Sequence, residues 1–159
     1  MQPSWNVQTA EQHLRQSCAV MARLIEQHGS CTLPEREFRP FETLASQIIS
    51  QQLSLKAAAT IKQRVRGIVA GFTPAGFLAV TEDELRQAGL SSAKARYIHE
   101  LARRVDDGRL DLDSLRHAPD EEVIARLTEL PGIGRWTAEM FLIFGLLRPD
   151  VLSLGDAGL

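Results

Sequence analysis

Apolar residues recur along this chain every three to four positions, the period of an α-helix with one buried face. Residues that can cap helices, and glycines or prolines that end them, separate the apolar segments. The caps predicted within the chain are Ser54, the capping box of Thr81 with Glu84, and Ser91 or Ser92. The first predicted helix begins at a Thr9 cap and runs to about His28, with Gly29 as its stop. Further helices are predicted over residues 41–49, 55–70, 82–88, 92–106, 121–130 and 134–147, with a short helix or turn at 110–118.

Strand-like alternation is nearly absent from this pattern. The nearest candidate, residues 151–154, is too short to define a strand. The predicted fold class is therefore all-α: a bundle of short helices forming one domain over residues 1–159.

The segment LTELPGIGRWTAEMF, residues 127–141, predicts a helix-hairpin-helix. Pro131 ends one helix, and Gly132 and Gly134 are expected to adopt conformations closed to other residues. The first amides of the next helix lack intrahelical partners and, with the helix dipole, form an anion site. An ordinary tight turn between two helices is the alternative.

The formal net charge is −2, so composition alone gives no support to nucleic-acid binding. An anion site made of backbone amides needs no basic side chain and is compatible with this charge. The two cysteines, Cys18 and Cys31, are too few for a zinc site or a four-cysteine iron–sulfur cluster. No apolar stretch is long enough to span a membrane.

Three segments in order, FETLASQIISQQLSLKAAATI, LPGIGRWTA and RPDVLSLGDAGL, resemble the helix-hairpin-helix (Gly/Pro/Asp) DNA glycosylase superfamily. The first segment is similar to the 3-methyladenine DNA glycosylase II branch. The resemblance implies that the backbone amides of Gly132, Gly134 and Thr137 bind a DNA phosphate. It also implies that the main-chain carbonyls of Thr128, Leu130 and Gly132 hold a monovalent cation, a structural Na⁺ or K⁺, with no cofactor required.

Asp156 matches the family's essential aspartate in its spacing from the hairpin. A carboxylate there would stabilise the positive charge that develops on a sugar as its N-glycosidic bond breaks. A loop or capping role is the alternative. The family usually has a proline and an aliphatic residue before the aspartate, where this chain has Ser153, Leu154 and Gly155, so a loosely held Asp156 is expected. Family members continue past the position of Leu159 into further helices, so the chain is expected to be truncated there.

Trp136 occupies the position at which bifunctional relatives carry a Schiff-base lysine. An indole cannot act as that nucleophile, so the resemblance implies a monofunctional enzyme that uses water. An indole face also attracts a cationic alkylated base. Met140, one turn later, is predicted to line the same pocket, with plain core filling as its alternative. Tyr97 and Trp5 are weaker pocket candidates.

A glycosylase that extrudes its target base must fill the gap left in the stack. The turn after residue 50 supplies the candidates, with Gln52 as the plug, Leu53 beside it and Ser54 touching the minor groove. Solvated helix-end residues are the alternative. Several basic residues are candidates for contacts to flanking phosphates: Lys56, Lys62, Arg64, Arg66, Lys94, Arg96 and Arg135.

The function predicted from these features is monofunctional excision of alkylated bases from damaged double-stranded DNA during base excision repair. The expected protein is a monomer without membrane association, located in the cytoplasm of a bacterium or in a eukaryotic nucleus. Three alternatives remain open: a non-catalytic helix-hairpin-helix DNA-binding module, a glycosylase for deaminated or oxidised bases, and a helical adaptor protein.

Overall fold

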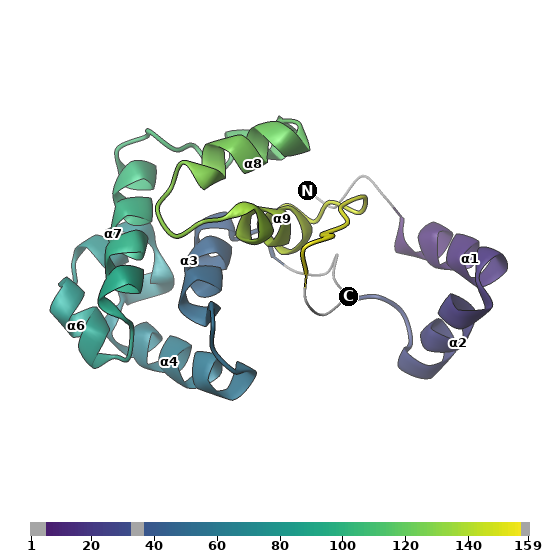
Figure 1. Ribbon diagram of the computed structural model, residues 1–159, viewed down its shortest axis with the longest axis horizontal. Coiled ribbons are helices and arrows are strands. Elements are labelled where there is room, and N and C mark those ends of the chain that lie inside the picture. The colour runs from purple at the N-terminus through teal and green to yellow at the C-terminus, as the bar shows by residue number, and fades with distance from the viewer. Residues whose placement is uncertain (1–5, 33–36, 157–159) are drawn as a thin grey trace.

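The computed structural model of the protein describes residues 6–32 and 37–156, and in these ranges every regular element is helical. Residues 7–28 form a hairpin of two helices, α1 (Val7–Ser17) and α2 (Ala19–His28). This hairpin lies to one side of the remaining helices in Figure 1. None of the described helices is long and apolar enough to cross a membrane.

The prediction of one helix from Thr9 to His28 is wrong in two respects. Cys18 has extended backbone angles (φ −146°, ψ 113°) and separates α1 from α2. The cap of α1 is Asn6, whose side chain accepts a hydrogen bond from the Thr9 amide at 3.2 Å. The spacing of apolar residues did not reveal this break, because it stays helical on both sides of Cys18.

The body of the fold consists of helices of 5 to 15 residues joined by turns. Its helices are α3 (Pro40–Ser50), α4 (Leu55–Ile68), α5 (Pro74–Leu78), α6 (Glu82–Gln87), α7 (Ser92–Asp106), α8 (Asp120–Thr128) and α9 (Arg135–Phe144). Single 3-10 turns lie at Ala70–Phe72 and Ser114–His117. The predicted helices of the body are confirmed, except that α4, α8 and α9 end two or three residues earlier than expected. Helix α5 was not predicted, because five residues are too few to show a period.

The predicted helix starts are confirmed where the cap is a local side-chain contact. Ser54 caps α4 and Ser91 caps α7. Thr81 and Glu84 form a capping box at α6, in which each side chain bonds the other's backbone amide. These contacts depend on residues three positions apart, which explains why the sequence was sufficient to find them.

Helices α3, α7 and α9 meet around one apolar core, with α3 in the centre of the bundle (Figure 1). Burying this core supplies the main driving force for folding. Its largest fully buried side chains are Leu44, Ile48, Ile49, Val65, Phe77, Leu85, Ile98, Leu101, Leu115, Leu127, Phe141 and Leu142. The core holds the C-terminal end of α3 beside the turn that connects α8 to α9.

Candidate active site and DNA interface

The turn between α8 and α9 depends on one glycine. Gly132 has a φ of 84°, which L-residues with side chains rarely adopt. A Cβ atom there would lie 2.1 Å from Cδ2 of Tyr97, so only glycine fits. Tyr97 supports the hairpin from α7 and is not among the residues that line the cavity described below.

Gly134, the N-cap of α9, does not need a glycine's freedom, and that part of the prediction is wrong. Its angles (φ −91°, ψ 173°) are open to any residue, and an added Cβ would meet nothing within 4 Å. The open space in front of this residue leaves room for a large ligand to approach the backbone.

The start of α9 presents free amides at this open space. The first bond of the helix runs from the Ala138 amide to the Gly134 carbonyl at 3.0 Å, so the amides of Arg135, Trp136 and Thr137 precede it. Among the described residues, no side chain caps this end of the helix. Unpaired amides and the positive end of the helix dipole make an anion site.

Gln51 joins the end of α3 to the hairpin. Its Nε2 donates to the Gly132 carbonyl at 2.8 Å and to Oγ1 of Thr137 at 3.3 Å. These partners are 81 and 86 positions away in sequence. The sequence offered no signal for this bond, which fixes the hairpin relative to the turn that follows α3.

The predicted cation site shares one carbonyl with this bond. The Gly132 carbonyl accepts from Gln51, and the Leu130 carbonyl accepts from the Ile133 amide at 3.2 Å. Each carbonyl oxygen has a second lone pair. A Na⁺ or K⁺ ion held by these carbonyls and that of Thr128 therefore stays a prediction.

The predicted wedge residues lie on an exposed turn between α3 and α4. Gln52 has a positive φ of 56°, and the side chains of Gln52, Leu53 and Ser54 are exposed. The Ser54 hydroxyl accepts from the Ala57 amide at 3.3 Å and so caps α4. Leu55, at the first position of α4, is 92% exposed and adds an apolar side chain that the sequence did not single out.

Lys94 supports this turn from α7 and is not free for a phosphate as the sequence suggested. Its Nζ donates to the carbonyls of Ile49 and Gln51 at 2.8 and 2.6 Å. These carbonyls belong to the last turn of α3 and the residue after it, where carbonyls lack helical partners. Burial in this position lowers the pKa of Lys94.

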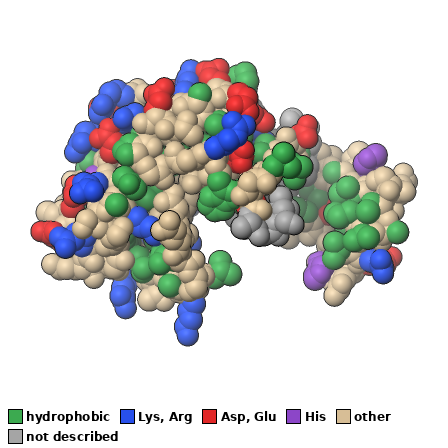
Figure 2. Space-filling model, in the orientation of Figure 1, with side chains coloured by type: hydrophobic (Ala, Val, Ile, Leu, Met, Phe, Trp, Pro, Cys, Tyr) green, Lys and Arg blue, Asp and Glu red, His purple; other side chains and the backbone are tan. Residues whose placement is uncertain are grey.

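Two other basic residues that the sequence suggested for phosphate contacts already form ion pairs within the protein. Arg66 pairs with Glu42, and Arg135 pairs with Glu121 and Glu139. Within the described residues, no ion pair involves the remaining candidates, Lys56, Lys62, Arg64 and Arg96. In Figure 2, Lys and Arg side chains project from the region of α4, whereas basic and acidic side chains are mixed over α8.

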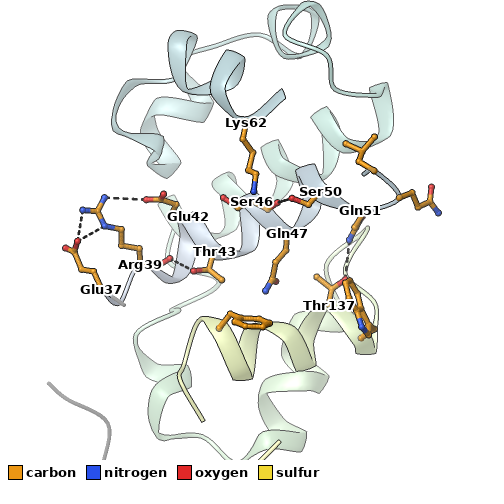
Figure 3. A pocket seen from close by; sticks show the side chains of 14 residues that line it. Glu37, Arg39, Glu42, Thr43, Ser46, Gln47, Ser50, Gln51, Lys62 and Thr137 are labelled. Atoms are coloured by element: carbon orange, nitrogen blue, oxygen red, sulfur yellow. Dashed lines mark hydrogen bonds and ion pairs between the residues drawn. The ribbon is translucent and has the colours of Figure 1, made fainter. Parts of the chain in front are cut away.

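A cavity of about 720 Å³ opens between α3 and α9, beside the wedge turn (Figure 3). Trp136 and Phe144 of α9 line it, together with a row of polar side chains from α3. Met140, predicted as a pocket residue, is buried in the core and does not line this cavity. Phe144, two turns after Trp136 on α9, lines the cavity instead.

Trp136 connects this cavity to the candidate carboxylate. Its Nε1 donates a hydrogen bond to Oδ2 of Asp156 at 2.9 Å. Asp156 is half-buried, and its amide bonds the Ser153 carbonyl at 3.1 Å. The structure thus brings together the two residues that the sequence assigned to catalysis and base binding, 20 positions apart.

The loop before Asp156 is held by a side chain. The Ser153 hydroxyl is buried and donates to Oε2 of Glu139 at 2.6 Å, and Arg135 donates to Oε1 of the same glutamate at 3.0 Å. These bonds tie the loop to α9. These bonds give the loop a support that the sequence did not reveal, while the expectation that Asp156 is loosely held stays a prediction for this last of the described residues. Trp5 lies outside them.

An all-α bundle with a hairpin anion site and a carboxylate beside a cavity defines a helix-hairpin-helix protein with a candidate glycosylase site. Residues 45–159 match the HhH-GPD superfamily of base excision DNA repair proteins. The chain belongs to this superfamily, as the resemblance implied.

Individual proteins that are similar to this chain are named as DNA glycosylases. A DNA-3-methyladenine glycosylase of Saccharomyces cerevisiae is 40% identical over 130 residues, which cover 75% of this chain and 44% of that protein. A putative DNA-3-methyladenine glycosylase of Bacillus subtilis is 30% identical over 87% of this chain and 51% of its own length. This chain spans about half the length of these curated relatives.

Solved structures show the same fold. A DNA-3-methyladenine glycosidase of Bacillus halodurans superposes with a TM-score of 0.78 at 40% identity, over 99% of this chain and 72% of its own. A 3-methyladenine DNA glycosylase of Schizosaccharomyces pombe, solved with abasic DNA, superposes with a TM-score of 0.76 at 31% identity, over 94% of this chain and 75% of its own.

Proposed function

We propose that this chain provides the DNA-binding and catalytic part of a monofunctional DNA glycosylase that removes alkylated bases of the 3-methyladenine type. One observation carries the proposal: the indole of Trp136 lines a cavity and donates to the carboxylate of Asp156 at 2.9 Å. A base bound beside that indole would place its glycosidic bond near the carboxylate.

The chemistry that this arrangement supports is hydrolysis. The bond between C1′ and the base nitrogen breaks, and its electron pair neutralises the alkylated base. Water adds at C1′ and loses a proton to Asp156 or to solvent. The negative charge of Asp156 stabilises the sugar cation that develops as the bond breaks.

Trp136 accounts for the choice of substrate and of nucleophile. A flat, electron-rich indole attracts a cationic base by stacking and cation–π interaction. An indole cannot form a Schiff base, so water is the nucleophile in this proposal. An alkylated purine leaves as a neutral base, which reduces the need for a general acid.

The proposed partner is damaged double-stranded DNA, bound by a monomer. The free amides at the start of α9 take a phosphate, while the exposed turn from Gln52 to Ser54 fills the gap left by the extruded base. The Gln51 bond to the Gly132 carbonyl (2.8 Å) fixes the distance between these two contacts.

The test is a release assay on methylated duplex DNA with the full-length protein. The proposal expects free 3-methyladenine, detected by mass spectrometry, and abasic sites in equal amount. Binding to the duplex without release of any base would instead identify a non-catalytic DNA-binding module. Release of deaminated or oxidised bases alone would assign a different lesion class.

A further inference from the structure

Gln47 holds an unused hydrogen-bonding group at the cavity between α3 and α9. The residue lies on α3, and its side chain extends toward α9 in Figure 3. Its Oε1 is buried, and no described residue forms a hydrogen bond with either Oε1 or Nε2. Gln47 as a whole is half-buried, but a buried carbonyl oxygen without a partner is destabilising, so stability alone does not explain a glutamine at this position.

Three other polar side chains along this wall, those of Thr43, Ser50 and Gln51, already have partners. The Thr43 hydroxyl donates to the Arg39 carbonyl at 2.9 Å, and the Ser50 hydroxyl donates to the Ser46 carbonyl at 2.7 Å. The Gln51 amide is bound to the hairpin. Gln47 is therefore the amide of this wall that remains available to a ligand in the cavity that Trp136 lines.

We propose that Gln47 reads the edge of the extruded base and makes the pocket selective for adenine-type lesions. A primary amide matches the adenine edge in two bonds: its oxygen accepts from the N6 amino group, and its nitrogen donates to N7. The terminal torsion of glutamine is soft, and neither end of this amide is held, so the group can turn to meet the base. The inference rests on the proposed function.

The same geometry disfavours guanine-type lesions. Guanine presents the O6 acceptor where adenine presents a donor, and in 7-methylguanine the N7 acceptor is blocked by the methyl group. The amide can then form at most one bond, from Nε2 to O6, and its oxygen stays unpaired. Leaving a buried polar group unpaired is what gives a site selectivity against the wrong substrate.

Dimethyl sulfate-treated duplex DNA tests this assignment, because it contains 3-methyladenine and 7-methylguanine in one substrate. The measured quantity is the ratio of their single-turnover release rates, with both bases quantified from the same reaction. Gln47→Leu should lower this ratio on the order of tenfold, mainly through slower release of 3-methyladenine. An unchanged ratio in a folded variant would overturn the inference.

Matched variants separate this effect from others. Gln52→Leu makes the same chemical change on the wedge turn and should slow both bases alike, so that the ratio stays at its wild-type value. Gln47→Met, which keeps side-chain length without the amide, repeats the test if Gln47→Leu fails to fold, as judged by thermal unfolding. Wild-type protein that releases neither base would refute the proposed function and this inference together, whereas an unchanged ratio refutes the inference alone.

Discussion

At the scale of single residues, the contact between Trp136 and Asp156 determines what the site can do. The indole N–H orients the carboxylate, and the carboxylate in turn fixes the ring at the cavity wall. Ser153 and Glu139 hold the loop from the other side. The indole that is proposed to hold the base and the carboxylate that is proposed to stabilise the sugar cation are thereby placed side by side.

Asp156→Asn should abolish base excision while leaving binding to an abasic-site analogue nearly intact. Asparagine keeps an oxygen that can accept the Trp136 N–H, so the loop keeps its position and only the charge is lost. Loss of one preorganised electrostatic group typically lowers the rate of the chemical step on the order of a hundredfold or more. Single-turnover rates at fixed salt measure this step, because slow product release is then excluded. Near-normal excision would remove Asp156 from the mechanism.

No covalent protein–DNA product should form when the protein acts on a lesion or abasic duplex in the presence of borohydride. The physical reason is that Trp136 stands where a Schiff-base lysine would be required. Gel analysis after reduction measures the product directly, with a known bifunctional glycosylase as the positive control. A trapped adduct mapped to a lysine of this chain would contradict the monofunctional mechanism.

At the scale of elements, the hairpin between α8 and α9 combines two glycines with different tasks. Gly132 is required by the fold, because of its positive φ and the ring of Tyr97 beneath it. Gly134 is not required by its own conformation, and the space around it is open. The first glycine shapes the turn, while the second leaves room for a phosphate.

Gly134→Ala and Gly132→Ala should therefore have different effects. Gly134→Ala should keep the thermal midpoint and weaken binding to damaged and undamaged duplex alike, because phosphate contacts do not read sequence. Gly132→Ala should lower the free energy of unfolding on the order of 1–3 kcal/mol through backbone strain, in addition to the clash with Tyr97. Calorimetry and fluorescence anisotropy measure the two effects. Unchanged DNA affinity in Gly134→Ala would place the phosphate elsewhere.

At the scale of the whole molecule, a chain with a net charge of −2 is proposed to bind a polyanion, and several of its candidate phosphate-binding cations are not free. Arg66, Arg135 and Lys94 are engaged within the protein. The backbone amides at the start of α9 and the side chains of Lys56, Lys62 and Arg64 on α4 remain as the proposed phosphate contacts. Affinity for DNA should therefore decrease as the salt concentration rises. The slope of this decrease should be shallow, because few phosphates are contacted.

Lys56→Ala should reduce the slope of log affinity against log salt by about 0.9, the value for one lost phosphate contact. Lys56 lies on the first turn of α4 beside the wedge turn, and no described residue pairs with it. Arg109→Ala removes the same charge from a side chain already neutralised by Asp107 and is the matched control. Equal slopes for Lys56→Ala and the wild-type protein would exclude Lys56 from the interface.

Local sequence signals were sufficient for much of the fold. Caps such as Ser54 and Ser91, the Thr81–Glu84 capping box and the glycine turn before α9 all act between residues a few positions apart. Such contacts form in any context that allows a helix, so the helices of the body and the hairpin could be predicted. The catalytic role of Asp156 was predicted only through the family resemblance, and its hydrogen bond to Trp136 was not predicted.

Tertiary structure alone decided how these elements serve the site. The Gln51 bond to the hairpin, the Lys94 support of the wedge turn and the unpaired amide of Gln47 join positions far apart in sequence or depend on what packs opposite them. The choice of Phe144 over Met140 as a cavity wall has the same origin, because both share a helix face with Trp136 and only the packing of α9 against its neighbours exposes one and buries the other. A periodic sequence specifies which face of a helix is apolar, whereas the surrounding helices determine which residues of that face remain open to a ligand.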